Sequence, residues 1–288
     1  MFDRKKQRSF IEAALEGTLL PCPGCNNATE HEFRRYERAT WCNGYAKFQA
    51  YWVSGYPNFS IFVEGNKKLP FFAFSALPDY TCPGAGACLK YCYSFKAWRG
   101  SAAFFRQVQN TLLLKSAAGR DHIAKAWRAL PYGVPVRLYV DGDIDSSETL
   151  TFWIGLCGAR PDLGAYGYSK SWEIFLAFDA TGVEWPSNYF VNLSSGSRYG
   201  VRAKERMAAL PISRGEFITL PTAHKAPDRR LDRAAWAVYV KSIKATARAY
   251  GYARSFVCPG KCGDCLPQGE HACGSNKFKG IPIVIGAH

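Results

Sequence analysis

Short apolar runs alternate with amphipathic helical patterns through most of this chain. Apolar runs typical of strands occupy residues 71–75, 136–140, 165–168, 189–193, 217–220, 255–257 and 281–285. Helical patterns lie between several of them, most clearly at 101–118, from 147 onward and at 228–250. Alternation of strand and helix is typical of parallel βα units. The pattern therefore predicts an α/β fold with a parallel sheet.

The first 66 residues have a different pattern. A short helix is expected at 9–17, a Cys-Pro-Gly-Cys turn follows at 22–25, and an aromatic run from 45 to 63 is typical of a strand. Two parts are therefore expected: a small N-terminal appendage that contains cysteines (1–66) and a larger α/β part (67–288).

Polar residues follow the predicted strands at the point where each strand ends. Asp141 and Asp143 follow the second predicted strand, and Ser169 and Lys170 follow the third. The next two strands end at or near Asn192, Ser194, Ser195 and His224. Ligands bind at the carboxyl edge of a parallel sheet or barrel, so these residues are candidates for a binding or catalytic site. The alternative for Asp143, with Ser147 and Glu148, is to cap the following helix. An ordinary surface histidine is the alternative for His224.

The eleven cysteines fall into groups. The central group is Cys82, Cys88 and Cys92, and the C-terminal group is Cys258, Cys262, Cys265 and Cys273. Thiolates bind zinc and iron–sulfur clusters, and short spacings bring several sulfurs to one centre. Three ligands leave a coordination position open, as in a reactive centre, whereas four suit a closed zinc site or an auxiliary cluster. Cys157 stands alone in an apolar helical pattern and is expected to be a buried small hydrophobe.

A third candidate metal site lies in the N-terminal part. Its ligands would be Cys22, Cys25, His31 and Cys42, although this spacing matches no standard zinc finger. A disulfide framework is disfavoured because the chain is long enough to bury a large core. No apolar segment resembles a signal peptide or is long enough to span a bilayer, so a reducing, cytoplasmic location without membrane contact is expected.

The chain carries a formal net charge of +14, and 15% of its residues are aromatic. Positive charge attracts polyanions, and aromatic rings can stack on bases, so nucleic acid is a candidate partner. A solvated basic surface explains the same composition equally well, because only the stretches 4–8 and 229–233 are densely basic.

Several strings give the chain a family resemblance. TCPGAGACLKYCYS, VRLYVDGDIDS, YGYSKS, VNLSSGSRYG and VCPGKCGDC occur in this order from about residue 70 and resemble the phage gene product 88 family. The cysteine triplet after the first strand also resembles the cluster loop of radical S-adenosylmethionine enzymes. Its gaps of five and three residues differ from the usual three and two, and Asp141-Gly142-Asp143 stands where those enzymes carry Gly-Gly-Glu.

The second resemblance implies a partial (β/α) barrel of radical S-adenosylmethionine type. The three central cysteines would bind a 4Fe–4S cluster that cleaves S-adenosylmethionine after reduction by an external electron donor. Asp143 would bind the methionine ammonium group, and Ser169 and Lys170 the carboxylate or ribose. Asn192, Ser194 and Ser195 would bind the ribose or the substrate. His224 would contact the substrate or donate a proton.

Two classes of function stay open. The first is a phage-type iron–sulfur enzyme with one or two clusters that acts on a nucleic acid. The second is a noncatalytic nucleic-acid-binding protein, related to replication or transcription, that is stabilised by zinc in its cysteine sites.

Overall fold

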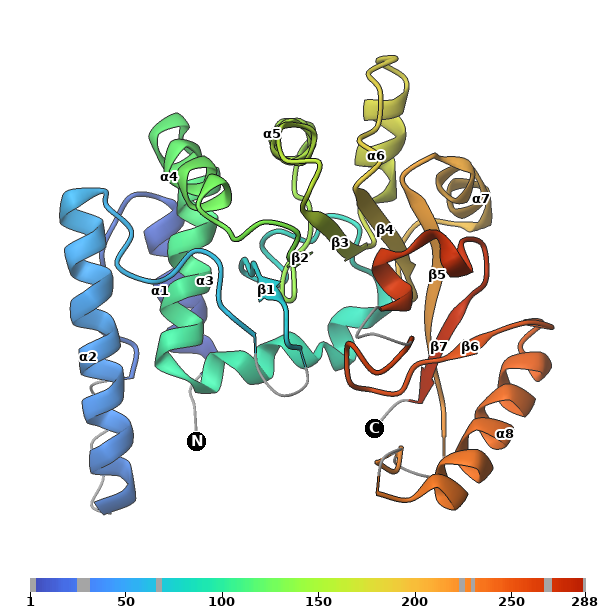
Figure 1. The fold of residues 1–288 in the computed structure, drawn as a ribbon. Coiled ribbons are helices and arrows are strands. Elements are labelled where there is room, and N and C mark those ends of the chain that lie inside the picture. Colours follow the sequence, from blue (N-terminus) through green and yellow to red (C-terminus); the bar gives the residue numbers. More distant parts are fainter. Residues whose placement is uncertain are drawn as a thin grey trace.

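The computed structural model describes residues 4–24, 32–65, 69–222, 226–228, 231–266 and 271–286. Within these residues, seven parallel strands form one open sheet in the order β1-β2-β3-β4-β5-β7-β6 (Figure 1). The strands are β1 (Phe72–Ala73), β2 (Pro135–Leu138), β3 (Gly164–Ser169), β4 (Tyr189–Ser194), β5 (Ser213–Leu220), β6 (Phe256–Val257) and β7 (Ile283–Gly286). The predicted α/β fold is confirmed, and the sheet does not close into a barrel.

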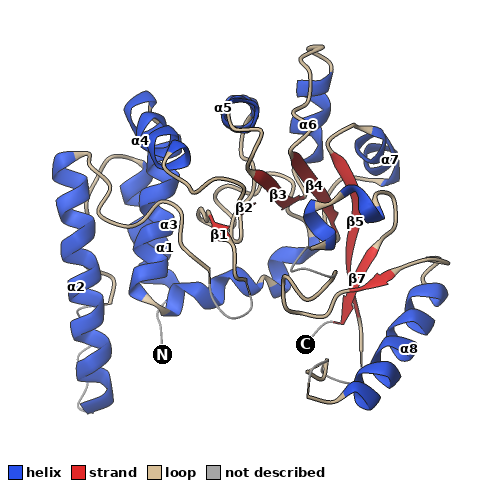
Figure 2. Ribbon diagram, viewed as in Figure 1, coloured by secondary structure: helices blue, strands red, loops and turns tan. Residues whose placement is uncertain are grey.

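Helices precede the sheet and connect its strands (Figure 2). They are α1 (Arg4–Leu15), α2 (Glu32–Ser54), α3 (Ser101–Leu114), α4 (Ala117–Arg128), α5 (Ser147–Ala159), α6 (Trp172–Asp179), α7 (Val201–Ala209) and α8 (Arg233–Ala249). The helix expected at 101–118 ends early, because Ser116 begins a new helix by accepting a hydrogen bond from the backbone N–H of Gly119. No helix in the described ranges is long and apolar enough to cross a membrane.

The strand expected within residues 45–63 was wrong. Most of this run belongs to helix α2, and the rest is largely irregular. Trp41, Tyr45 and Phe48 recur at helical spacing and pack against Phe10 and the phenylalanines of α3. The N-terminal helices therefore share one core with α3.

The two faces of the sheet have different coverings. Side chains such as Val136, Ala165 and Val191 point into the large core formed with helices α3 to α7. The opposite face carries Tyr166 and Tyr168, which pack in a second cluster with the C-terminal cysteines. The C-terminal segment thus covers part of the second face of the sheet.

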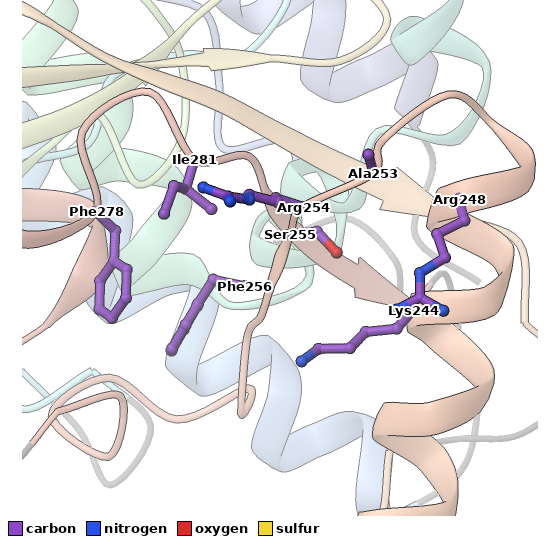
Figure 3. Close-up of a pocket in the computed structure, with 8 residues that line it drawn as sticks. All are labelled: Lys244, Arg248, Ala253, Arg254, Ser255, Phe256, Phe278 and Ile281. Atoms are coloured by element: carbon purple, nitrogen blue, oxygen red, sulfur yellow. The ribbon is translucent and has the colours of Figure 1, made fainter.

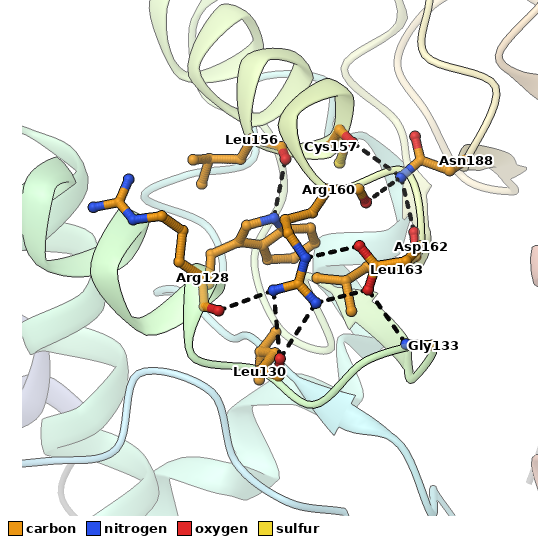
Figure 4. Close-up of polar contacts among 10 residues, drawn as sticks. Arg128, Leu130, Gly133, Leu156, Cys157, Arg160, Asp162, Leu163 and Asn188 are labelled. Carbon is orange, nitrogen blue, oxygen red and sulfur yellow. Dashed lines mark hydrogen bonds and ion pairs between the residues drawn. The ribbon is translucent and has the colours of Figure 1, made fainter.

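A polar network fixes the connection between α5 and β3 (Figure 4). The Arg160 guanidinium pairs with Asp162 at 2.7 Å and also donates to the carbonyl oxygens of Arg128 and Leu130. Cys157 lies nearby, and its side chain is fully buried in the large core. Burial raises the pKa of its thiol. The prediction that Cys157 is a buried small hydrophobe is confirmed.

Candidate metal centres at the sheet

The loop that carries the central cysteines is tied to the carboxyl ends of β3 and β4. Ala85 and Ser197 form an antiparallel bridge, and the Gly84 carbonyl accepts the Arg198 backbone N–H at 3.0 Å. The Ser197 hydroxyl donates to the Lys170 carbonyl oxygen at 3.0 Å. A side chain at Gly84 would overlap that same carbonyl oxygen, so this close approach requires glycine. The cysteine loop is therefore held against the strand ends by its backbone.

Cys82 is a partly buried thiol of the central group. Burial raises its pKa, the charge of Asp143 raises it further, and the charge of Lys170 opposes the rise. Cys92 also interacts electrostatically with Cys82. Cys88 lies toward β4, where its backbone N–H points at the Gly196 carbonyl oxygen at 3.5 Å. The loop thus gathers two thiols and two charged side chains, with a third thiol beside them.

Asp143 joins the ends of β2 and β3. Its carboxylate accepts the backbone N–H of Lys170 at 2.7 Å and that of Ile144 at 2.8 Å. Burial nevertheless raises the pKa of Asp143, because these hydrogen bonds only partly compensate for lost hydration. The capping alternative for Asp143 was wrong, since Ser146 accepts the Thr149 N–H and caps α5.

The other residues predicted at the strand ends lie in two places, some beside the cysteine loop and some away from it. Lys170 donates to the Ser194 hydroxyl at 2.8 Å, and the buried Ser169 hydroxyl accepts the Ser171 N–H at 3.0 Å, so both serines lie beside the loop site. Ser195 instead accepts the Thr219 N–H of β5 at 3.3 Å. His224 lies outside the described residues.

Asn192 is fully buried and contacts the C-terminal cysteine segment. Its amide donates to the Cys273 carbonyl at 2.9 Å and to the Gly167 carbonyl at 3.0 Å. Its oxygen accepts a hydrogen bond from Arg214 Nε at 2.8 Å. These bonds give Asn192 a structural role between β3, β4 and β5.

The four C-terminal cysteines gather on the face of the sheet that carries Tyr166 and Tyr168. Burial raises the pKa of Cys258, and the other three thiols raise it further. Burial also raises the pKa of Cys273 to about 12, and Cys265 and Cys262 add to the rise. All four cysteines pack in the same cluster of side chains on this face of the sheet.

Two arginines lie against this cysteine group and were not predicted. Arg214 is fully buried and donates to the carbonyl oxygens of Phe278 and Ile281. Arg137 lies over the Tyr168 ring at 4.7 Å, and its buried Nε has no hydrogen-bond partner among the described residues. Neither forms an ion pair with a carboxylate in those residues. Arg137 is a cation inside the apolar strand sequence VRLYV, a signal that sequence reading alone could have used. The mixed sequence ISRGEF around Arg214 offers no such signal.

Both arginines act on the thiols. Burial is the main influence on the pKa of Cys262 and raises it, whereas the charge of Arg137 lowers it. Arg214 lowers the pKa of Cys273 in the same way. Arg214 is fully buried and Arg137 is partly buried, and neither has a carboxylate partner in the described residues, so both cations favour negative charge on the neighbouring sulfurs.

The arrangement of the cysteines does not by itself form a metal site. Across the described ranges, no three or more His, Cys, Asp or Glu side chains are grouped as metal ligands. Thiols are ligands of zinc and of iron–sulfur clusters, and the unpartnered Arg137 Nε is compatible with an anionic metal centre beside it. To bind a metal ion or cluster, the cysteine side chains must turn toward a common point.

The N-terminal candidate site is only partly described. Cys25 and His31 lie outside the described residues. Cys42 is in a disulfide, a state in which its sulfur is not a thiolate ligand. The Cys22 thiol points at the Trp41 carbonyl oxygen at 3.7 Å.

The family model named gene product 88 matches residues 52–278, well over half of the chain. The protein belongs to the gene product 88 family. The match confirms the family resemblance seen from about residue 70 and extends it back into α2. It includes the central and C-terminal cysteines but not the N-terminal group. No curated protein and no solved structure matches the chain.

Proposed function

We propose that this gene product 88 family member is an iron–sulfur enzyme of the radical S-adenosylmethionine type. Cys82, Cys88 and Cys92 would hold a 4Fe–4S cluster at the carboxyl edge of the sheet. The observation that carries the proposal is the docking of their loop across β3 and β4, which brings Cys82 beside Asp143 and Lys170. An open parallel sheet with its reactive groups at this edge is compatible with that chemistry.

The chain's own residues would position the cofactors. When bound, the cluster supplies an electron to S-adenosylmethionine. Asp143 presents a buried carboxylate that can accept an ammonium group, because charge pairing offsets lost hydration. Lys170 presents an ammonium group for a carboxylate or ribose oxygen, oriented by its hydrogen bond to Ser194.

The C-terminal cysteines would form a second, closed centre with a structural or electron-relay role. Four thiolates around Zn²⁺ carry a charge of about −2, and an oxidised 4Fe–4S cluster with four thiolates carries the same charge. The two cations of Arg137 and Arg214 balance that charge within an apolar region. Their charges therefore support an occupied centre more than a set of protonated thiols.

Metal analysis tests the proposal directly. Anaerobically purified protein is expected to be brown and to contain about four to eight irons with matching acid-labile sulfide. Cys88→Ala is expected to remove the central cluster and abolish S-adenosylmethionine cleavage while the fold is retained. Cys157→Ala is the matched control, because Cys157 is a fully buried cysteine of α5 that is not one of the predicted ligands.

A colourless protein that contains only zinc would refute the radical chemistry. It would favour a second candidate, a noncatalytic, zinc-stabilised protein that binds nucleic acid. The positive charge of the chain and the balance of two arginines against four thiols suit that candidate as well.

A further inference from the structure

A basic pocket lies where the end of α8 approaches the beginnings of β6 and β7 (Figure 3). It encloses about 350 Å³. Its walls are formed by Lys244, Arg248, Ala253, Arg254, Ser255, Phe256, Phe278 and Ile281. Figure 3 shows Lys244 and Arg248 projecting from α8 toward the segment that carries Ser255 and Phe256.

The charge of this pocket is one-sided. Lys244, Arg248 and Arg254 are exposed cations, and no acidic residue lines the pocket. None of the three forms an ion pair within the described part of the chain. Three cations around one hollow repel each other unless an anion lies between them. The pocket is therefore suited to a ligand with at least one phosphate-like group.

An aromatic pair forms one side of the same pocket. The rings of Phe256 and Phe278 lie 5.0 Å apart at an angle of 35°. Both are only partly buried. Proteins that bind single-stranded nucleic acids combine arginine and lysine with aromatic side chains. The cations contact the phosphates, and the bases stack on the rings. A base enclosed in a duplex would not reach these rings.

We propose that this pocket binds the backbone of a single-stranded nucleic acid, with a neighbouring base against the phenylalanine pair. The pocket residues come before β6 or β7 in the chain, except Phe256, which is the first residue of β6. The central cysteine loop lies at the opposite, carboxyl edge of the parallel sheet. The pocket would therefore hold a polymer at a distance from the central cysteines. This binding does not depend on whether the chain is an iron–sulfur enzyme.

The test is fluorescence anisotropy with a labelled single-stranded oligonucleotide of about 20 nucleotides, titrated with the full-length protein at several salt concentrations. The variant combines Lys244→Gln, Arg248→Gln and Arg254→Gln. Its affinity is expected to fall at least about tenfold, and the slope of log affinity against log salt is expected to fall by about 2, or about 0.7 per lost phosphate contact.

A matched control removes the same charge elsewhere. Lys115→Gln, Lys125→Gln and Arg202→Gln change exposed cations just after α3, on α4 and on α7 that form no ion pair in the described residues. Because only overall attraction changes, its affinity is expected to fall less than about threefold. Circular dichroism checks that both triple variants keep the fold.

Three results would overturn the inference. The first is that wild-type protein binds no oligonucleotide at low salt, and the second is that both triple variants lose affinity equally. The third is that binding to vesicles containing phosphatidylserine depends on the pocket cations while binding to oligonucleotides does not, which would assign the pocket to a lipid surface. The Cys88→Ala variant is expected to bind the oligonucleotide like wild type, so failure of the proposed enzyme function is distinguishable from failure of this site.

Discussion

Replacing Arg137 with methionine is expected to change metal affinity and metal-free stability differently. Arg137 lies in β2, over the Tyr168 ring and within electrostatic reach of Cys262. Without metal, the raised pKa values of the cysteines keep their thiols protonated at neutral pH, so the guanidinium has no negative partner there. Methionine is similar in length and needs no hydrogen bond.

The expected magnitudes follow from these contacts. In the metal-free protein, loss of the cation–π contact costs about 1 to 2 kcal/mol, and removal of the unsatisfied Nε returns about 1 to 3 kcal/mol. The stability of the metal-free protein should therefore fall by no more than about 1 kcal/mol, and it rises by up to about 2 kcal/mol if the unsatisfied Nε is the larger effect. With a centre of charge −2 on the order of 8 Å away and an effective dielectric constant of about 20, about 4 kcal/mol of attraction is lost, and about half of that if solvent screens the pair. Metal affinity should fall roughly 30-fold to 1,000-fold.

Two measurements separate these effects. Competition with a chelator reports metal affinity, and urea unfolding of the metal-free protein reports stability. Arg137→Lys keeps the charge and is expected to keep most of the affinity. Arg106→Met is the matched control, because Arg106 on α3 also has a buried Nε without a hydrogen-bond partner in the described residues. The argument that Arg137 balances the charge of the metal centre would be refuted by either of two results. One is a metal affinity of Arg137→Met within threefold of wild type, and the other is an equal fall in affinity for Arg106→Met.

Three other substitutions test the fold around the site. Asn192→Leu removes three buried hydrogen bonds, one of them to an arginine, and is expected to lower the free energy of unfolding by about 3 to 5 kcal/mol in urea; a loss below 1 kcal/mol would contradict this. Gly84→Ala is expected to displace the central cysteine loop and lower its metal content, because a Cβ there overlaps the Lys170 carbonyl, whereas Gly100→Ala has space and should leave metal content unchanged. Asp162 has its pKa lowered to about 2 by its hydrogen-bonded arginine, so its contribution is present above about pH 4 and disappears as pH falls toward 2. Asp162→Asn should therefore flatten acid unfolding between pH 4 and 2, and an unchanged profile would count against this ion pair.

The alternation of strands and helices could be predicted because each element follows from a local pattern. Apolar runs indicated β1 to β7, and the helical pattern from residue 147 matched α5. Composition misled the prediction within residues 45–63, where many aromatic residues suggested a strand although their spacing was helical. The placement of β7 between β5 and β6 depends on long-range pairing, which no local pattern contains.

The candidate site was predictable to the extent that it depends on strand ends. Asp143 and Lys170 meet because β2 and β3 are parallel neighbours. Asn192 does not join them, because it lies two residues before the end of β4, where its side chain contacts the Cys273 segment. The contact between Asn192 and Cys273 joins residues 81 positions apart, and only the tertiary structure brings them together.

β2 connects the two cysteine groups. Tyr93 follows Cys92 of the central group, and its hydroxyl donates to the Val140 carbonyl just after β2 at 3.0 Å. Within the strand, Arg137 interacts electrostatically with Tyr93 and with Cys262 of the C-terminal group. A cation between two anionic centres attracts both and reduces their mutual repulsion. Arg137 is partly buried, and its enclosed Nε has no hydrogen-bond partner in the described residues, which is unfavourable in an apolar strand unless nearby charges compensate it. Its position in β2 is explained best if both cysteine groups carry negative charge in the working protein.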